Sequence, residues 1–191
     1  MNEQSRRPRC LALVGMAGSG KTLCAQHLEQ RGFYQFRFGG IVVDEVVRRG
    51  LDINPHNERT VREEFRNQDG MDAIAKRALP HLRAAAEHHQ TIIIDGLYSF
   101  SEYKTLIQAF GGDLILVAIV AERALRYTRL NERPERPLTA QEAEQRDWLE
   151  IERIEKGGPI AIADYTLLNN GAPQNLLDEL DTLLERLALY P

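Results

Sequence analysis

The segment Gly15–Thr22 constrains the fold of this chain more than any other. It reads Gly-Met-Ala-Gly-Ser-Gly-Lys-Thr and satisfies every fixed position of G-x-x-x-x-G-K-[ST]. The apolar run Cys10–Val14 precedes it, and helical spacing of apolar residues follows over Thr22–Gln30. A strand, a glycine-rich loop and a helix in this order form a phosphate-binding loop, in which backbone N–H groups and the helix dipole hold phosphate oxygens. The sequence therefore predicts nucleotide binding. The alternative is a chance glycine cluster in an ordinary strand-turn-helix.

Each position of this loop has an expected role. Lys21 is expected to bridge the β- and γ-phosphates, and the Thr22 hydroxyl to ligate Mg²⁺, so ATP and Mg²⁺ are the predicted cofactors. The residues expected to bind the nucleotide are Gly15, Ala17, Gly18, Ser19, Gly20, Lys21 and Thr22.

Short apolar runs alternate with longer segments of helical spacing along the rest of the chain. The predicted strands are Cys10–Val14, Thr91–Ile94, Leu114–Val120 and Tyr165–Leu168. The predicted helices are Thr22–Gln30, Met71–His88, Ser101–Phe110, Glu122–Glu132, Thr139–Lys156 and Leu176–Leu187. Capping-box spacing marks two helix starts, after Ser99 and after Thr139. This alternation predicts an α/β fold around a mainly parallel sheet.

Composition limits the partners and the compartment. The chain has 191 residues, which predicts a single domain over residues 1–191. A net charge of −4 argues against nucleic acid as a partner, and no apolar run reaches the roughly 18 residues of a membrane span. Met1–Cys10 is charged, but the apolar stretch after it is too short for a signal peptide. The two cysteines, Cys10 and Cys24, form no disulfide framework. We expect a cytoplasmic monomer or homodimer.

A second acidic anchor is expected at Asp95. It ends the apolar run Thr91–Ile94 and precedes Gly96. In parallel α/β sheets the carboxyl ends of the strands hold the site, so Asp95 can contribute to Mg²⁺ binding. The alternative is an aspartate that caps a turn with Gly96. The guanine-reading tetrad Asn-Lys-x-Asp is absent from the sequence, and the small size favours a small-molecule kinase.

With these features in place, the chain resembles the nucleoside monophosphate kinase and dephospho-CoA kinase group of P-loop kinases. It is most similar to the adenylate-kinase-related proteins known mainly from archaea. The motifs that carry the resemblance are Arg37–Gly39, Gly70–Arg77, Asp95-Gly96, Arg129–Arg133, Arg146-Asp147 and Ala163–Tyr165. The resemblance implies a three-layer P-loop NTPase fold with a five-stranded parallel sheet in the order 2-3-1-4-5. It also implies a short helical lid after the fourth strand.

The acceptor side departs from that family. Val43 lies in the stretch where relatives carry an arginine on the second helix, and Tyr98 follows Asp95-Gly96 where they carry another. The acceptor region is expected at about residues 37–88, where Arg37, Arg62, Arg66 and Arg77 are the available guanidinium groups. Of these, Arg77 is favoured. The predicted substrate-binding residues are Arg37, Arg77, Asp95 and Tyr98.

The lid is expected at about residues 126–146. Arg126, Arg129, Arg133 and Arg136 lie within eleven residues and run from a helix into a proline-bounded loop. Positive charge closing over a transferring phosphoryl group stabilises its oxygens, so Arg129 and Arg133 are predicted to be catalytic with Lys21. The alternative is a basic helix end that complements the helix dipole. The resemblance also implies that the loop containing Asn170 contacts the adenine.

These observations predict an ATP-dependent kinase that transfers the γ-phosphoryl group to a small nucleotide-like acceptor. One alternative is dephospho-CoA kinase chemistry on a ribose hydroxyl, with Asp44 as the base. Another is a regulatory ATP-binding module with slow hydrolysis, which the departures at Val43 and Tyr98 keep open.

Overall fold

The fold is built on a parallel β-sheet at the centre of the molecule. The computed structural model describes residues 9–191. The N-terminal segment used above to argue against a signal peptide therefore lies almost entirely outside the described residues. The strands are β1 (Arg9–Val14), β2 (Tyr34–Arg37), β3 (Thr91–Asp95), β4 (Leu114–Val120) and β5 (Tyr165–Leu168).

The five strands lie in the order β2-β3-β1-β4-β5, and every neighbouring pair is parallel. This confirms the fold class that the sequence predicted. The central strand β1 is fully covered, and its residues alternate between two cores because successive side chains of a strand point to opposite faces. Ala12 and Val14 pack into one core, while Leu11 and Leu13 pack into the other.

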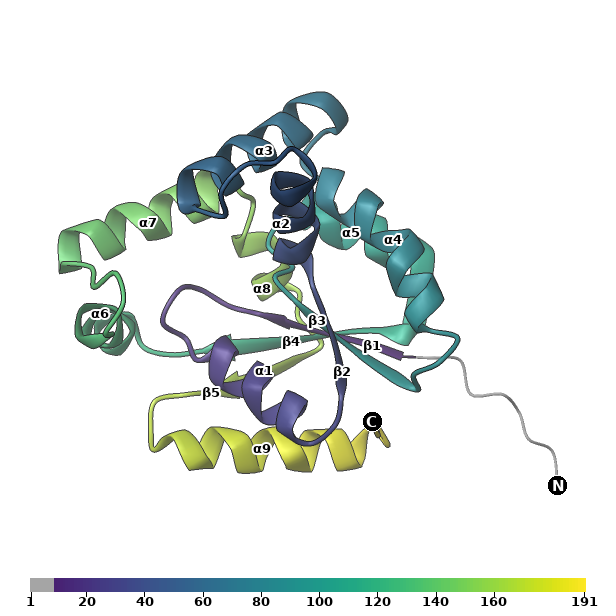
Figure 1. Cartoon of the computed structure of the whole chain (residues 1–191). Helices are drawn as coiled ribbons and strands as arrows, with labels where there is room; N and C mark the ends of the chain where they lie inside the picture. The colour runs from purple at the N-terminus through teal and green to yellow at the C-terminus, as the bar shows by residue number, and fades with distance from the viewer. Residues whose placement is uncertain (1–8) are drawn as a thin grey trace, which may run out of the picture.

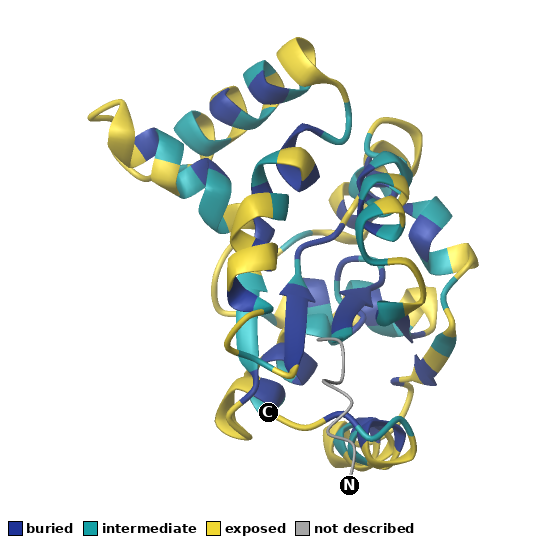
Figure 2. Cartoon of the chain, turned by 90° about the vertical axis from the view of Figure 1, so that its right-hand side faces the viewer, coloured by how far each residue is buried: buried dark blue, intermediate teal, exposed yellow. Residues whose placement is uncertain are grey.

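Helices cover both faces of the sheet (Figure 1). On one face lie α1 (Lys21–Gln30) and α9 (Pro173–Arg186), whose apolar residues share a core with Leu11 and Leu13. On the other face lie α4 (Ala73–Ala85), α5 (Phe100–Phe110) and the short α8 (Gly157–Ala161). Buried residues concentrate in the strands and on the inner faces of these helices (Figure 2). The result is the three-layer arrangement expected of this fold.

Apolar periodicity did not reveal three elements of the acceptor region, namely β2, α2 (Phe38–Arg48) and α3 (Pro55–Asp69). Strand β2 is at the edge of the sheet and has no buried residue, so it lacks the continuous apolar run of the central strands. Helix α3 buries only Val61 and Phe65 and is otherwise polar. It begins at a signal that the sequence does contain, because the Asn54 side chain accepts a hydrogen bond from the Asn57 N–H and Pro55 follows.

A helical hairpin follows β4. It consists of α6 (Arg123–Glu132) and α7 (Ala140–Glu152), which contact each other. The predicted capping boxes are confirmed at Thr139, which starts α7, and at Ser99, which starts α5. Within this hairpin, Leu130 and Ala143 pack against Ala17 of the phosphate-binding loop. The hairpin therefore lies over the loop.

Two further expectations concern the whole chain. No helix of the described residues is long and apolar enough to cross a membrane. Cys10 and Cys24 are both buried and free, as the absence of a disulfide framework predicted, and burial raises the pKa of each thiol to about 12.

Candidate functional site

The phosphate-binding loop connects the end of β1 to the start of α1. At two of its glycines, neighbouring atoms lie so close to the backbone that a side chain would not fit. A Cβ at Gly15 would overlap the carbonyl oxygen of Ile119, and one at Gly20 would overlap the side-chain amide of Asn169. Gly20 also has a φ of 111°, in the left-handed region that other residues rarely adopt. The glycine pattern in the sequence therefore reflects steric necessity in the loop.

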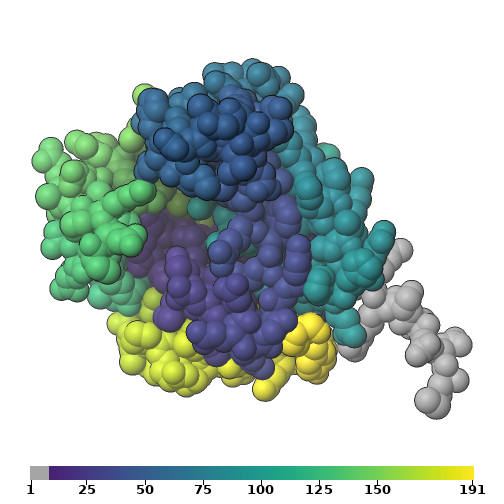
Figure 3. Space-filling model, viewed as in Figure 1, coloured from purple at the N-terminus to yellow at the C-terminus, as the bar shows by residue number. Residues whose placement is uncertain are grey.

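A cavity of about 410 Å³ opens against this loop. Its walls come from the loop itself, from the end of β3, and from α6, α7 and the turn before α8. The polar and charged side chains that line it are Lys21, Thr22, Asp95, Tyr98, Arg129, Arg133, Arg146 and Lys156. The space-filling view shows a hollow on this face, bounded by α3 above and by α6 and α7 at the left (Figure 3). We call this cavity the nucleotide pocket.

Lys21 lies at the floor of the nucleotide pocket. Its ammonium donates hydrogen bonds to the carbonyl oxygens of Gly15, at 2.6 Å, and Met16, at 3.1 Å. Burial, together with the positive charge of Lys156, lowers the pKa of Lys21 to about 7. Lys21 has no carboxylate in ion-pair contact within residues 9–191, and a bound phosphate would supply such an anionic partner.

Thr22 and Asp95 line the same pocket. A hydroxyl and a carboxylate are the hard oxygen ligands that Mg²⁺ prefers, and Mg²⁺ usually completes its shell with phosphate oxygens and water. No group of three or more His, Cys, Asp or Glu side chains within residues 9–191 could hold a metal by itself. The residues therefore fit a magnesium ion that arrives with a nucleotide.

Two of the four predicted lid arginines line the nucleotide pocket, whereas Arg126 and the exposed Arg136 do not. Arg129 and Arg133 line it, and Nη1 of Arg129 is buried without a hydrogen-bond partner in the described residues. Arg126 was expected to be part of the positive charge that closes over the phosphoryl group, and the structure shows that it is not. It is 6% exposed, forms a two-pronged pair with Asp147 at 2.5 and 3.0 Å, and donates to the Ala17 carbonyl. The guanidinium therefore joins α7 to the phosphate-binding loop. It is buried between them and is not available to close over a phosphate.

Two basic residues near the C-terminal end of the hairpin complete the pocket. Arg146, part of the family-like pair Arg146-Asp147, lines the pocket. Lys156 was missed. It is 4% exposed, pairs with Glu150 at 2.5 Å, and lies 4.8 Å above the Tyr98 ring. The sequence offered no signal for Lys156, since it merely ended a predicted helix.

The structure does not bring Arg37 and Arg77 to the nucleotide pocket. Arg37 extends outward from the edge strand β2 and forms an exposed ion pair with Glu29 at 3.2 Å. Arg77 pairs with Asp69 at 2.6 Å and stacks 3.9 Å from the centre of the Phe65 ring. These arginines already have carboxylate partners, which explains their positions. Of the predicted substrate-binding residues, Asp95 and Tyr98 line the pocket.

Asp44 and Asn170 also differ from expectation. Asp44 lies on α2 in a separate depression that Arg77 also lines, so the structure does not place it as a base beside the phosphate-binding loop. Asn170 is exposed and bonds to Glu122 at the start of α6. Its neighbour Asn169 is the residue that contacts the loop, donating to the Ser19 carbonyl at 2.8 Å. Asn169 also accepts a hydrogen bond from Arg129 at its backbone carbonyl.

This arrangement can be compared with known proteins. A family model described as an AAA domain matches residues 11–150, which includes the phosphate-binding loop and most of the hairpin. A UPF0200 protein of Thermococcus gammatolerans is 36% identical over 178 residues, covering 92% of this chain and 93% of the relative. The chain belongs to the UPF0200 family. A UPF0200/UPF0201 protein of Archaeoglobus fulgidus is 31% identical, and the match covers 94% of this chain but 56% of that longer relative.

Solved structures share the fold of this UPF0200 family member. A shikimate kinase from Bacteroides thetaiotaomicron superposes with a TM-score of 0.59 at 14% identity, covering 93% of this chain and 98% of the other. A gluconokinase from Sinorhizobium meliloti gives a TM-score of 0.56 at 15% identity, with 96% and 95% covered. At such low identity these likenesses show the fold, which is that of small P-loop kinases.

Proposed function

We propose that this UPF0200 chain is an ATP-dependent phosphotransferase that moves the γ-phosphoryl group to a small, nucleotide-like acceptor. One observation carries the proposal. Five cationic side chains converge on the nucleotide pocket from separate parts of the chain, together with Thr22 and Asp95. The cationic residues are Lys21, Arg129, Arg133, Arg146 and Lys156. Phosphoryl transfer depends almost entirely on positioning and on stabilising spread negative charge, which such a pocket can supply.

In the proposed reaction an acceptor oxygen forms a bond to the γ-phosphorus while the bond to the β,γ-bridging oxygen breaks, which yields ADP and the phosphorylated acceptor. Mg²⁺ held by Thr22 and Asp95 would neutralise phosphate charge. A phosphate acceptor is already anionic and needs no base. A hydroxyl acceptor must lose its proton, and Asp95 is the one carboxylate among the described residues that line the pocket. For the hydroxyl alternative, Asp95 therefore replaces Asp44 as the proposed base.

The finer assignments belong to the same proposal. The chain acts as one kinase domain, with the acceptor region at about residues 37–88 and a lid at about residues 126–146. The similarity of its motifs to adenylate-kinase-related proteins supports that grouping. We further propose a cytoplasmic monomer or homodimer that binds neither nucleic acid nor membrane, in keeping with its net charge of −4.

The function is tested by measuring ADP release with Mg²⁺ and ATP against a panel of acceptors. The panel contains the nucleoside monophosphates, dephospho-CoA, shikimate and gluconate. We expect one acceptor to raise ADP release well above the rate without acceptor, with one phosphorylated product per ADP. Equal, slow ADP release throughout the panel would instead support the regulatory module, which the departures at Val43 and Tyr98 from the resembled monophosphate kinases keep open.

Lys156 provides a prediction that separates chemistry from stability. Lys156→Met leaves the buried Glu150 with only the half-exposed Arg146 as a partner, so we expect both the melting temperature and kcat to fall, kcat by about tenfold or more. The double variant Lys156→Met/Glu150→Leu removes the stranded carboxylate. It should recover the melting temperature but not kcat. Recovery of both would make Lys156 a structural residue only.

A further inference from the structure

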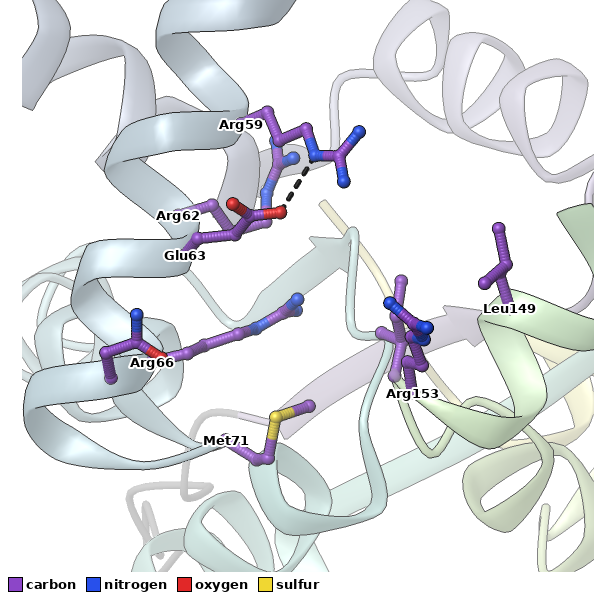
Figure 4. Close-up of a pocket in the computed structure, with 9 residues that line it drawn as sticks. Arg59, Arg62, Glu63, Arg66, Met71, Leu149 and Arg153 are labelled. Atoms are coloured by element: carbon purple, nitrogen blue, oxygen red, sulfur yellow. Dashed lines mark hydrogen bonds and ion pairs between the residues drawn. The ribbon is translucent and has the colours of Figure 1, made fainter.

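A second cavity lies beside the nucleotide pocket, between α3 and the C-terminal end of α7. Its volume is about 470 Å³, within the range of small-molecule sites. Its apolar wall consists of Met71, Leu149 and Ile154. Four arginines also line it, namely Arg59, Arg62, Arg66 and Arg153. We call it the arginine pocket (Figure 4).

The charge of the arginine pocket is poorly compensated. Glu63 is the one carboxylate among its described lining residues, and it pairs with Arg59 at 2.8 Å. Arg62 approaches Glu58 only to 4.0 Å. The Arg153 side chain is exposed and has no ion pair within residues 9–191. Several guanidinium groups therefore face one cavity with their hydrogen-bonding capacity unused.

Arg66 is the most informative of these residues. Its Nε and Nη2 atoms are buried without a hydrogen-bond partner in the described part of the chain. Figure 4 shows this side chain extending from α3 into the cavity, with Arg153 on the opposite wall. The charge of Glu102 acts on Arg66, but no hydrogen bond joins the two. An unpaired buried donor is costly, and a bound oxyanion would satisfy both nitrogens of this planar fork.

The arginine pocket is next to the site of phosphoryl transfer. Arg146 lines the nucleotide pocket, while Leu149 and Arg153 line the arginine pocket. These residues are three and seven positions apart, so they follow one side of α7 and its C-terminal end. The backbone at Tyr98 and Ser99 links the two cavities on the other side. Ser99 donates to the Met71 carbonyl at 3.4 Å, and Tyr98 lines the nucleotide pocket.

We propose that the arginine pocket binds the acceptor of the transfer reaction, with Arg66 and Arg153 holding an oxyanion group of that acceptor. The group is a phosphate or a carboxylate, and the rest of the molecule contacts the apolar wall. This inference rests on the proposed function, because it assigns the acceptor of that reaction to a cavity. It also supplies arginines for an acceptor region whose expected residues, Arg37 and Arg77, lie elsewhere.

The test measures acceptor binding directly, by calorimetry on the full chain saturated with Mg²⁺ and a non-hydrolysable ATP analogue. AMP and dephospho-CoA, which are nucleotide-like, form the phosphate arm. Shikimate and gluconate form the carboxylate arm, and binding in that arm would support the arginine pocket but contradict a nucleotide-like acceptor. We expect one arm to bind the parent protein. The affinity should fall at least tenfold in Arg66→Gln and in Arg153→Gln. Arg83→Gln, which removes the same charge from an exposed position on α4, should change it less than twofold.

Three results would overturn the proposal: binding unchanged in both pocket variants, an equal loss in Arg83→Gln, or no binding in either arm. Melting temperatures identify a variant that fails to fold. Because Arg153 is exposed, Arg153→Gln keeps the test decisive if Arg66→Gln is unstable. Binding of the ATP analogue is measured first and separately. Its absence would refute the proposed function, whereas its presence without acceptor binding would refute only the arginine pocket.

Discussion

Lys21→Ala is expected to lower kcat for phosphoryl transfer by about 10²–10³-fold, the effect of removing one preorganised charge-stabilising donor. The Lys21 ammonium sits on the loop carbonyls of Gly15 and Met16, at the floor of the nucleotide pocket. Arg126 also donates to a loop carbonyl, that of Ala17, but it does not line the nucleotide pocket. ADP release with the acceptor identified by the panel is the measurement. Activity within tenfold of the parent would contradict the role given to the loop.

Lys21→Ala should leave the fold intact. The pH dependence of the free energy of unfolding tests separately whether Lys21 is buried as the structure shows. Burial lowers the pKa of Lys21 to about 7 from its ordinary value of 10.5, so between these values the unfolded chain binds more protons than the folded one. The Lys21 contribution to the free energy of unfolding therefore rises as pH increases from about 7 to 10.5. Lys21→Ala should lack this part of the rise in nucleotide-free urea unfolding. Identical pH profiles would show that Lys21 is well solvated.

Features with a strict local requirement could be predicted from the sequence. The phosphate-binding loop was found because its glycines are imposed by contacts with Ile119 and Asn169. Asp95 was found because it ends a buried central strand, whose apolar run is unambiguous. The edge strand β2 lacks such a run, since no residue of it is buried, and the parallel order of the sheet came from family resemblance.

Residue type alone could not separate the arginines by role. Arg77 lies in a family-like motif, yet Asp69 at the end of the preceding helix captures it. Arg66 was one of four available guanidinium groups but not a predicted substrate-binding residue, and the structure buries two of its nitrogens without a described partner. Which guanidinium faces a cavity depends on how α3 and α7 meet, and these helices are far apart in sequence. Packing between segments so far apart leaves no local sequence pattern from which the position of each arginine could be predicted.

The role of Arg126 also could not be predicted from residue type alone. Replacing Arg126 should have the second large effect that we expect, which is on stability. The pair with Asp147 is buried at both ends, with side chains 8% and 8% exposed. Breaking a buried pair strands a charge, so Arg126→Ala and Asp147→Ala should each lower the free energy of unfolding by about 3–5 kcal/mol. Urea unfolding measures this. The exposed pair of Arg59 and Glu63 is the control, and Arg59→Ala should cost less than about 1 kcal/mol.

The double variant Arg126→Met/Asp147→Leu decides whether the cost comes from the stranded charge or from the anchor itself. Apolar side chains of similar volume should restore most of the stability, because neither charge is then left buried. They cannot replace the hydrogen bond from Arg126 to the Ala17 carbonyl, which ties the hairpin to the phosphate-binding loop at 2.9 Å. We therefore expect the double variant to unfold almost like the parent but to bind the ATP analogue several-fold more weakly. Unchanged nucleotide affinity in this variant would mean that the loop keeps its shape without the hairpin, and that the contact at Ala17 serves stability alone.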